Sequence, residues 1–152
     1  MDLALPNDFK EFLRLLRVHG VEYILVGGWA VIYHGYPRTT DDLDIWIGVA
    51  PENAKRVVDV LKEFGFDIPE LSESLFLQND QIVRLGMEPV RIKIMTSASG
   101  VEFLDCYRER LETTLDNEPV SMINLKRLRL NKQASGRLKD LSDLEHLPEK
   151  EP

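Results

Sequence analysis

The sequence lacks the features of an exported or membrane-bound protein. It has one cysteine, Cys106, and therefore cannot form an internal disulfide. No apolar run approaches the roughly 20 residues that a membrane-spanning helix needs. The N-terminal segment MDLALPNDFKEF is acidic early and lacks the basic and then apolar pattern of a secretory signal. These absences predict a cytoplasmic protein, in a reducing compartment, with no membrane partner.

Several catalytic signatures are missing as well. The sequence has no G-x-S-x-G motif, and Cys106 has no evident partner, so no nucleophilic triad is predicted. The G-x-G-x-x-G fingerprint of dinucleotide-binding folds is absent. His19 and His146 have no cysteine or histidine neighbours at zinc-ligand spacing, and we expect His34 to be a packed or capping residue.

The charge is acidic overall but unevenly distributed. The formal net charge of −7 argues against broad nonspecific binding to nucleic acid, so nucleic acid is expected only as an acceptor substrate. The segment 124–139 is the exception, because it contains cations and no acid. Its basic residues are Lys126, Arg127, Arg129, Lys132, Arg137 and Lys139. Such a segment is either a phosphate contact or a solvated helix face.

Length and composition predict one domain over residues 1–152, with 124–147 as a C-terminal helical extension. Apolar periodicity and capping residues predict helices at 8–18 (capped by Asn7), 29–36, 51–64, 101–111, 124–133 (capped by Asn124) and 139–147, with a helical turn within 71–78. Short β-branched runs predict strands at 21–26, 43–49, 81–85, 89–95 and 118–123, with a hairpin between the third and fourth. The predicted class is α/β (α+β), a small mixed sheet flanked by helices.

Two glycines and two aspartates flank the first two predicted strands. Gly27 and Gly28 stand where a strand passes into a helix, and glycine there either lets backbone N–H groups approach a phosphate or makes a tight turn. Asp42 and Asp44 alternate with apolar residues, so both carboxylates point to one face, about 7 Å apart. Two such carboxylates can share Mg²⁺, although surface strands often begin with aspartate. The combination indicates a phosphate and metal site at one edge of the sheet.

Two stretches resemble a known family. The stretch GGWAVIYHGYPRTTDDLDIWI resembles the signature of small nucleotidyltransferases of the DNA polymerase β superfamily, in which two glycines are followed by D-x-D on the next strand. More closely, HGYPRTTDDLDIWI and the C-terminal NKQASGRLKDLSDLEHL resemble the minimal nucleotidyltransferase-like proteins of bacteria, some of which act as antitoxins or abortive-infection components. The resemblance implies a polymerase-β-like nucleotidyltransferase fold over most of residues 20–147.

The resemblance also implies roles for individual residues. Asp42 and Asp44 would be the catalytic acids and bind Mg²⁺, and Gly27 and Gly28 would hold the triphosphate of a nucleotide. The other implied nucleotide or phosphate contacts are Arg38, Thr40, Lys93, Lys132, Lys139 and Asp140. Arg38 and Thr40 are alternatively turn residues. Asp140 and Asp143 either orient the nearby cations or contact the nucleotide. Alternatively, they lie at an exposed helix N-terminus, where acidic residues are favoured in any case.

One position departs from the resemblance. Enzymes of this superfamily usually carry a third carboxylate on a later strand, and the matching position here is Lys93. Strand alternation supports this placement, because it turns Arg91, Lys93 and Met95 away from the apolar face and toward the aspartates. A protonated lysine cannot ligate a metal, but it can supply part of the charge of one.

Three outcomes follow from Lys93. Transfer chemistry is lost and a nucleotide binder remains, or one metal stays on Asp42 and Asp44, or another acid fills the role. The candidates for that acid are Glu88, Glu102 and Asp105. The leading hypothesis is a protein that binds a nucleoside triphosphate with Mg²⁺ and, if it is an active enzyme, transfers a nucleotidyl group to a hydroxyl. The alternative is a non-catalytic, antitoxin-like interaction module with a toxin-like protein partner.

Overall fold

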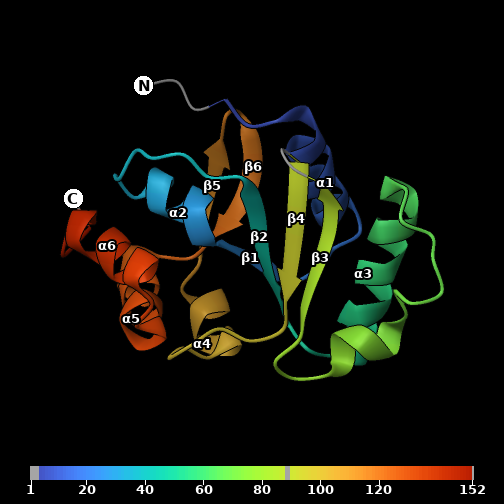
Figure 1. Cartoon of the computed structure of the whole chain (residues 1–152). Helices are drawn as coiled ribbons and strands as arrows, with labels where there is room; N and C mark the ends of the chain where they lie inside the picture. The colour runs from blue at the N-terminus through green and yellow to red at the C-terminus, as the bar shows by residue number, and fades with distance from the viewer. Residues whose placement is uncertain (1–3, 88–89, 152) are drawn as a thin grey trace.

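The computed structural model describes residues 4–87 and 90–151, and its centre is a six-stranded mixed sheet (Figure 1). The strands are β1 (Tyr23–Val26), β2 (Asp42–Ile47), β3 (Ile82–Met87), β4 (Val90–Met95), β5 (Leu111–Leu115) and β6 (Glu118–Met122). Their order in the sheet is β3-β4-β2-β1-β6-β5. Strand β1 is antiparallel to β2 and parallel to β6, and β2 is parallel to β4. The predicted mixed sheet flanked by helices is confirmed.

The helices lie on both sides of the sheet (Figure 1). They are α1 (Asn7–Val18), α2 (Gly27–Tyr33), α3 (Pro51–Phe64), η1 (Glu73–Leu77, a 3₁₀ helix), α4 (Phe103–Arg108), α5 (Leu125–Ser135) and α6 (Leu138–His146). Helix α3 has its predicted bounds, with proline in the first turn, where its missing N–H costs nothing. Among the described residues, no helix combines the length and apolar character that crossing a bilayer requires.

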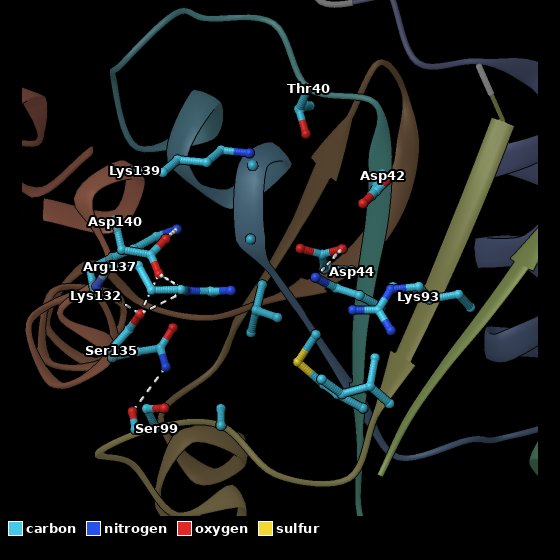
Figure 2. A pocket seen from close by; sticks show the side chains of 18 of the residues that line it. Thr40, Asp42, Asp44, Lys93, Ser99, Lys132, Ser135, Arg137, Lys139 and Asp140 are labelled. Carbon is cyan, nitrogen blue, oxygen red and sulfur yellow. Dashed lines mark hydrogen bonds and ion pairs between the residues drawn. The ribbon is translucent and has the colours of Figure 1, made fainter. Parts of the chain in front are cut away.

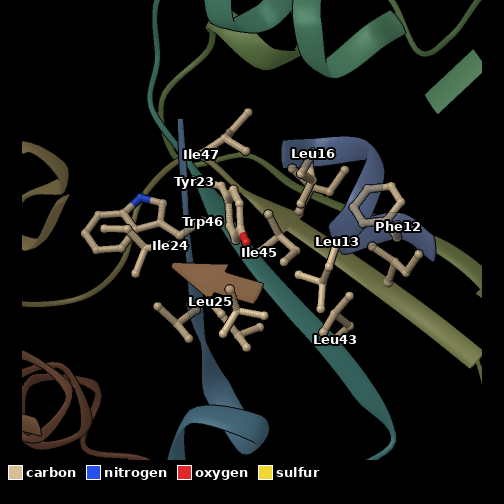
Figure 3. Close-up of a cluster of buried hydrophobic side chains, with 14 of the residues drawn as sticks. Phe12, Leu13, Leu16, Tyr23, Ile24, Leu25, Leu43, Ile45, Trp46 and Ile47 are labelled. Atoms are coloured by element: carbon tan, nitrogen blue, oxygen red, sulfur yellow. The ribbon is translucent and has the colours of Figure 1, made fainter. Parts of the chain in front are cut away.

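The alternation along β2 separates the core from the polar face. Leu43, Ile45 and Ile47 are fully buried, and they face the side of the sheet that α1 covers (Figure 3). Helix α1 contributes Phe12, Leu13 and Leu16 to the same cluster. Because side chains of a strand alternate between faces, this packing directs Asp42 and Asp44 to the opposite face. A slip of one residue would bury both aspartates in the core, so the apolar pattern fixes the register.

Strand β4 lies beside β2 and completes the polar face. Asp42 is paired in register with Arg91, and Asp44 with Lys93. Strand β3 continues the same row, with Arg84 in register with Lys93. The predicted hairpin of β3 and β4 is confirmed, although Glu88 and Pro89 lie outside the described residues.

Two predictions of local structure were wrong. The helix predicted at 101–111 spans only Phe103–Arg108, and Leu111 begins strand β5, which was not predicted. Strand β5 pairs with β6 through a turn at Asp116 and Asn117, both with positive φ, as a tight hairpin turn requires. Local sequence was misleading because RERL favours helix, whereas pairing with β6 decides the outcome.

The helix termini were predicted with mixed success. Asn7 does not cap α1, because the helix already includes it and Pro6 occupies the N-cap position without a side-chain hydrogen bond. Helix α2 begins at Gly27, not at Trp29, and ends at Tyr33. Asn124 caps α5 as predicted, since its side chain accepts a hydrogen bond from the backbone N–H of Arg127 at 2.8 Å.

Candidate functional site

A cavity of about 580 Å³ lies between the polar face of the sheet and helices α5 and α6 (Figure 2). It gathers residues that are far apart in the sequence. All of the site residues suggested by the sequence line it: Gly27, Gly28, Arg38, Thr40, Asp42, Asp44, Lys93, Lys132, Lys139 and Asp140. The sheet supplies the carboxylates, and the C-terminal helices supply most of the facing wall.

The two aspartates of β2 each face a cation of β4. Asp42 Oδ1 accepts a hydrogen bond from Arg91 Nε at 2.8 Å. Asp44 Oδ1 lies 3.7 Å from Lys93 Nζ, which is close enough for an ion pair but too long for a hydrogen bond. The negative charge on this face is therefore largely compensated by the protein itself.

Asp44 is the more buried of the two aspartates. Its side chain is 13% exposed, against 24% for Asp42, and its Oδ1 is buried without a hydrogen-bond partner. Burial raises the pKa of the Asp44 carboxyl, which the ammonium of Lys93 opposes and the charge of Asp42 reinforces. A buried carboxylate oxygen without a hydrogen-bond donor is unusual, and the charge of this one is compensated by the ion pair with Lys93.

The two glycines make room for neighbouring side chains. A Cβ atom at Gly27 would overlap Asp44 Oδ2, and one at Gly28 would overlap the hydroxyl of Thr40. Gly27 also has a φ of +73°, which side chains other than glycine rarely adopt. The glycines thus bring the start of α2 against the aspartate strand, and this close packing determines where Asp44 and Thr40 lie.

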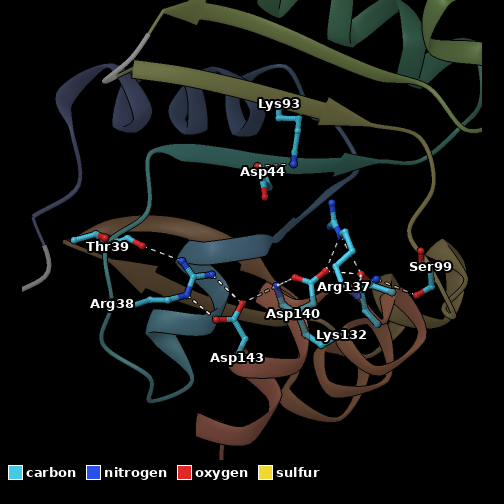
Figure 4. A network of polar contacts seen from close by, with 11 residues as sticks. Arg38, Thr39, Asp44, Lys93, Ser99, Lys132, Arg137, Asp140 and Asp143 are labelled. Atoms are coloured by element: carbon cyan, nitrogen blue, oxygen red, sulfur yellow. Dashed lines mark hydrogen bonds and ion pairs between the residues drawn. The ribbon is translucent and has the colours of Figure 1, made fainter.

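A buried network of charges joins the C-terminal helices to the segment before β2 (Figure 4). Lys132 Nζ lies 2.8 Å from Asp140 Oδ1 and 3.1 Å from Asp143 Oδ2. Arg38 donates from Nε and Nη2 to the two oxygens of Asp143, at 2.8 and 2.9 Å. The side chain of Lys132 is only 7% exposed. Arg38 and Lys132 are therefore held by Asp143 at the wall of the cavity.

Asp140 belongs to the same network. Its side chain accepts hydrogen bonds from Lys132, Ser135 and Arg137. Burial raises the pKa of the Asp140 carboxyl, but the hydrogen bonds from Lys132 and Ser135 outweigh burial and lower the pKa to about 2. Asp140 is therefore ionised at neutral pH and acts as the anchor of these three side chains.

Two cations of this wall remain accessible to a ligand. Lys139 is exposed, lines the cavity and has no ion pair or hydrogen bond within the described part of the chain. Arg137 is 76% exposed and bonds Asp140 through its Nε. Arg137 was predicted only as one of the six cations of the basic segment, and Arg84 was not predicted as a site residue, although both line the cavity. The β3–β4 hairpin was the signal for Arg84, because cross-strand neighbours share a face.

The carboxylates fit one divalent cation. Asp42 and Asp44 present oxygen ligands on one face, and the Oδ1 of Asp44 accepts no hydrogen bond, although it forms an ion pair with Lys93. Within residues 4–87 and 90–151, no group of three or more His, Cys, Asp and Glu side chains is arranged around a metal position. Of the alternative acids, Glu102 and Asp105 line a second cavity, and Glu88 lies outside the described residues. Mg²⁺ is commonly held by one or two carboxylates together with phosphate oxygens, so two suffice when a substrate brings the rest.

The second cavity, of about 910 Å³, adjoins the first. The two cavities share the lining residues Asp80, Ser97, Ala98 and Ser99. The wall of the second contains Trp46 and Phe103, whose rings meet edge to face with centroids 5.4 Å apart. Its charged lining is entirely acidic within the described residues, and consists of Glu22, Asp80, Glu102 and Asp105.

Comparison with known proteins identifies the family. A family model described as aminoglycoside-2''-adenylyltransferase matches residues 8–130, which include both glycines, both aspartates and Lys93. The chain belongs to the aminoglycoside-2''-adenylyltransferase family. The match covers β1 to β6 and about the first half of α5 but ends before α6. No curated protein matches the sequence.

Two solved structures show the same fold as this family member. The lincosamide antibiotic adenylyltransferase LnuA, in its lincomycin-bound crystal structure, has a TM-score of 0.56 and 15% sequence identity, over 95% of this chain and 97% of LnuA. A presumed nucleotidyltransferase of Thermotoga maritima has a TM-score of 0.56 and 14% identity, over 90% of this chain and 86% of the other. The nucleotidyltransferase fold that the sequence predicted is therefore confirmed.

Proposed function

We propose that the protein binds a nucleoside triphosphate in the first cavity and transfers its nucleotidyl group to a hydroxyl of an acceptor. The observation that carries this proposal is that Asp42 and Asp44, the glycine turn and the cations of α5 and α6 line one cavity. In the reaction, the acceptor oxygen bonds to the α-phosphorus while the bond from that phosphorus to the oxygen leading to the β-phosphate breaks. Pyrophosphate leaves, and the hydroxyl proton is released to solvent.

The residues of the cavity divide this work between them. Lys139 and Arg137 would neutralise the triphosphate beside Gly27 and Gly28. Asp42 and Asp44 would hold Mg²⁺, which when bound supplies charge neutralisation at the phosphates. Catalysis of this kind depends on positioning and electrostatics, because the protein forms no covalent bond with the substrate. The buried network of Arg38, Lys132, Asp140 and Asp143 would act indirectly, by fixing the wall that carries Lys139.

We further propose that the acceptor enters through the second cavity. This cavity shares Asp80 and Ser97–Ser99 with the first, so an acceptor seated there would lie next to the nucleotide cavity. Its acidic lining favours a cationic acceptor, and the half-buried Phe103, which packs edge to face on the buried Trp46, offers apolar contact to a ring. The names of the relatives agree with an amine-bearing acceptor, since the family is that of an aminoglycoside adenylyltransferase and LnuA is bound to lincomycin.

The test of nucleotide binding is a calorimetric titration of ATP and of GTP, each with and without Mg²⁺. We expect Mg²⁺-dependent binding by the wild type and none by the double variant Asp42→Ala and Asp44→Ala. The matched control is the double variant Asp59→Ala and Asp67→Ala, which removes the same charge from exposed positions outside the cavity. Unchanged binding after loss of Asp42 and Asp44 would refute the site.

The test of transfer uses ATP labelled in its α-phosphate, with an aminoglycoside or lincomycin as acceptor. We expect label to appear in one of these acceptors, and the double variant Glu102→Gln and Asp105→Asn to weaken binding of that acceptor while nucleotide binding stays the same. Equal acceptor affinity in this variant and the wild type would exclude the second cavity as the acceptor site.

A second candidate function is a non-catalytic, antitoxin-like interaction module with a toxin-like partner. The observation in its favour is the ion pair of Lys93 with Asp44, at the position where the resembling enzymes carry a carboxylate. In this case the purified protein would turn over no triphosphate with any acceptor. It would bind a partner protein with the same affinity in the presence and absence of nucleotide.

A further inference from the structure

Lys93 is built into the sheet at the place where its charge acts on Asp44. The parallel pairing of β2 and β4 sets the two residues side by side, and Nζ lies 3.7 Å from Oδ1. Both side chains are largely buried, with 19% of Lys93 and 13% of Asp44 exposed. Arg91 is placed against Asp42 in the same way. The carboxylate pair is therefore already neutralised before any ligand arrives.

We propose that Lys93 is a resident counter-ion that keeps divalent cations off Asp44 in the nucleotide-free protein, so that a divalent cation binds only together with the phosphates of a nucleotide. The nucleotide half of this proposal rests on the proposed function. The other half, the exclusion of a free cation, concerns only Lys93 and Asp44.

The physical reason is direct competition for one oxygen. A dication at Asp44 would lie close to the ammonium of Lys93, and the two positive charges would repel each other. This repulsion is screened less at a partly buried site than it would be in water. In the nucleotide-free protein, the residues that the structure describes add no third His, Cys, Asp or Glu ligand to Asp42 and Asp44, so nothing offsets this repulsion. Exclusion is therefore expected as long as Lys93 stays at Asp44.

A polyphosphate removes this conflict. Its oxygens supply further ligands to the cation, and they also accept hydrogen bonds from the ammonium. Lysine suits such an exchange, because its ammonium has three donors on a flexible stem. Lys93 can therefore turn from Asp44 to a phosphate oxygen without becoming an unpaired buried charge.

The decisive experiment measures binding of Mn²⁺ alone, by the electron paramagnetic resonance signal of the free ion. In the absence of nucleotide we expect Lys93→Met to bind Mn²⁺ at least about tenfold more tightly than the wild type. Lys93→Gln tests the same loss of charge with a polar side chain, in case the methionine variant folds poorly. Adding Asp44→Asn to either variant should abolish the gain, which locates the new affinity at Asp44. Equal affinity of the wild type and both lysine variants would overturn the proposal.

The matched control is Arg84→Met. Arg84 lies in register with Lys93 on the next strand and lines the same cavity, but one strand further from Asp44. We expect its removal to change Mn²⁺ affinity by less than about twofold, because the charge is more distant and exposed. A gain equal to that of Lys93→Met would mean that net charge, and not the Lys93 contact, excludes the cation.

The second arm repeats the titration with a non-hydrolysable nucleoside triphosphate analogue. We expect the analogue to raise the Mn²⁺ affinity of the wild type to that of Lys93→Met. If the analogue binds but leaves the wild type unable to hold Mn²⁺, joint binding is refuted. If the analogue binds to neither protein, the proposed function fails, while the comparison with Mn²⁺ alone still decides whether Lys93 excludes the cation.

Discussion

Arg38 and Asp143 form a bidentate ion pair although they are 105 residues apart in the sequence. Their side chains are 15% and 2% exposed, so the pair lies almost entirely out of water. Asp143 also contacts Lys132, which places one carboxylate between two buried cations. Through these contacts α6 is fixed to the segment that leads into β2, and one wall of the cavity is fixed to the other.

Loss of Asp143 should destabilise the fold strongly. The change Asp143→Ala leaves Arg38 and Lys132 with fewer partners in a buried environment, where removing one member of an ion pair typically costs about 3–5 kcal/mol. We expect a decrease of this size in the free energy of unfolding, measured by urea denaturation with circular dichroism. Glu145→Ala is the control, because Glu145 is exposed on the same helix and its loss should cost less than about 0.5 kcal/mol. Equal stability of the two variants would contradict a structural role for the pair.

Alanine at Gly27 should be more harmful than alanine at another glycine of similar backbone conformation. Gly27 and Gly136 have φ of +73° and +68°, so both variants suffer the same backbone strain, of about 1–2 kcal/mol. Only at Gly27 does the added Cβ overlap a side chain, that of Asp44, whereas nothing lies within 4 Å at Gly136. We expect Gly27→Ala to lose a further 1–3 kcal/mol or so, as overpacked sites do, and to weaken nucleotide binding as well. Calorimetry and urea denaturation of both variants would show whether the overlap matters.

The sequence was sufficient to predict the aspartate face because it depends on local alternation. Leu43 and Ile45 define the buried face of β2, and Asp42 and Asp44 then have only the other face available. The same reasoning placed Lys93 toward the aspartates, and the register of β2 with β4 agrees with it. The nucleotidyltransferase fold followed from these motifs and their resemblance to a family.

Long-range contacts were beyond local patterns. Strand β5 was missed because its pairing with β6, and not its own propensity, makes it a strand. The ion pair of Arg38 with Asp143 could not be read from a segment before β2 and a helix at the other end of the chain. The steric need for glycine at position 27 could not be predicted either, because a Cβ atom there would overlap Asp44 only once β1 and β2 have paired.

The stability of the protein in acid should depend on Asp140. The pKa of Asp140 is about 2 in the folded protein and about 3.9 in an unfolded chain. Its ionised form therefore contributes its full stabilisation of the fold at pH values above about 4. This contribution is lost as the pH falls from about 4 to about 2. We expect Asp140→Asn to lower stability at neutral pH and to flatten the loss of stability in this range. Urea midpoints measured from pH 7 to pH 2 would test both effects.

Asp44 provides the opposite case in the same experiment. Burial raises the pKa of its carboxyl, so the charged form destabilises the fold, and this penalty is relieved as the pH falls. Asp44→Asn removes the penalty, and we expect this variant to be more stable than the wild type at neutral pH and to lose stability more steeply in acid. A destabilised Asp44→Asn at neutral pH would show that its ion pair with Lys93 outweighs the cost of burial.

The basic segment 124–139 should divide into residues that bind nucleotide and residues that do not. Lys139 lines the cavity without an ion pair or hydrogen bond in the described part of the chain, whereas Lys126 is also exposed but lies on α5 outside the cavity. A lysine that contacts a phosphate contributes a charge-assisted hydrogen bond, which is worth about 1.5–3 kcal/mol. We therefore expect Lys139→Ala to weaken ATP binding roughly tenfold to a hundredfold, and Lys126→Ala to leave it within twofold or so, in calorimetric titrations at one salt concentration. Similar losses in both variants would mean that the overall charge of the segment attracts the nucleotide, and that Lys139 makes no specific contact with it.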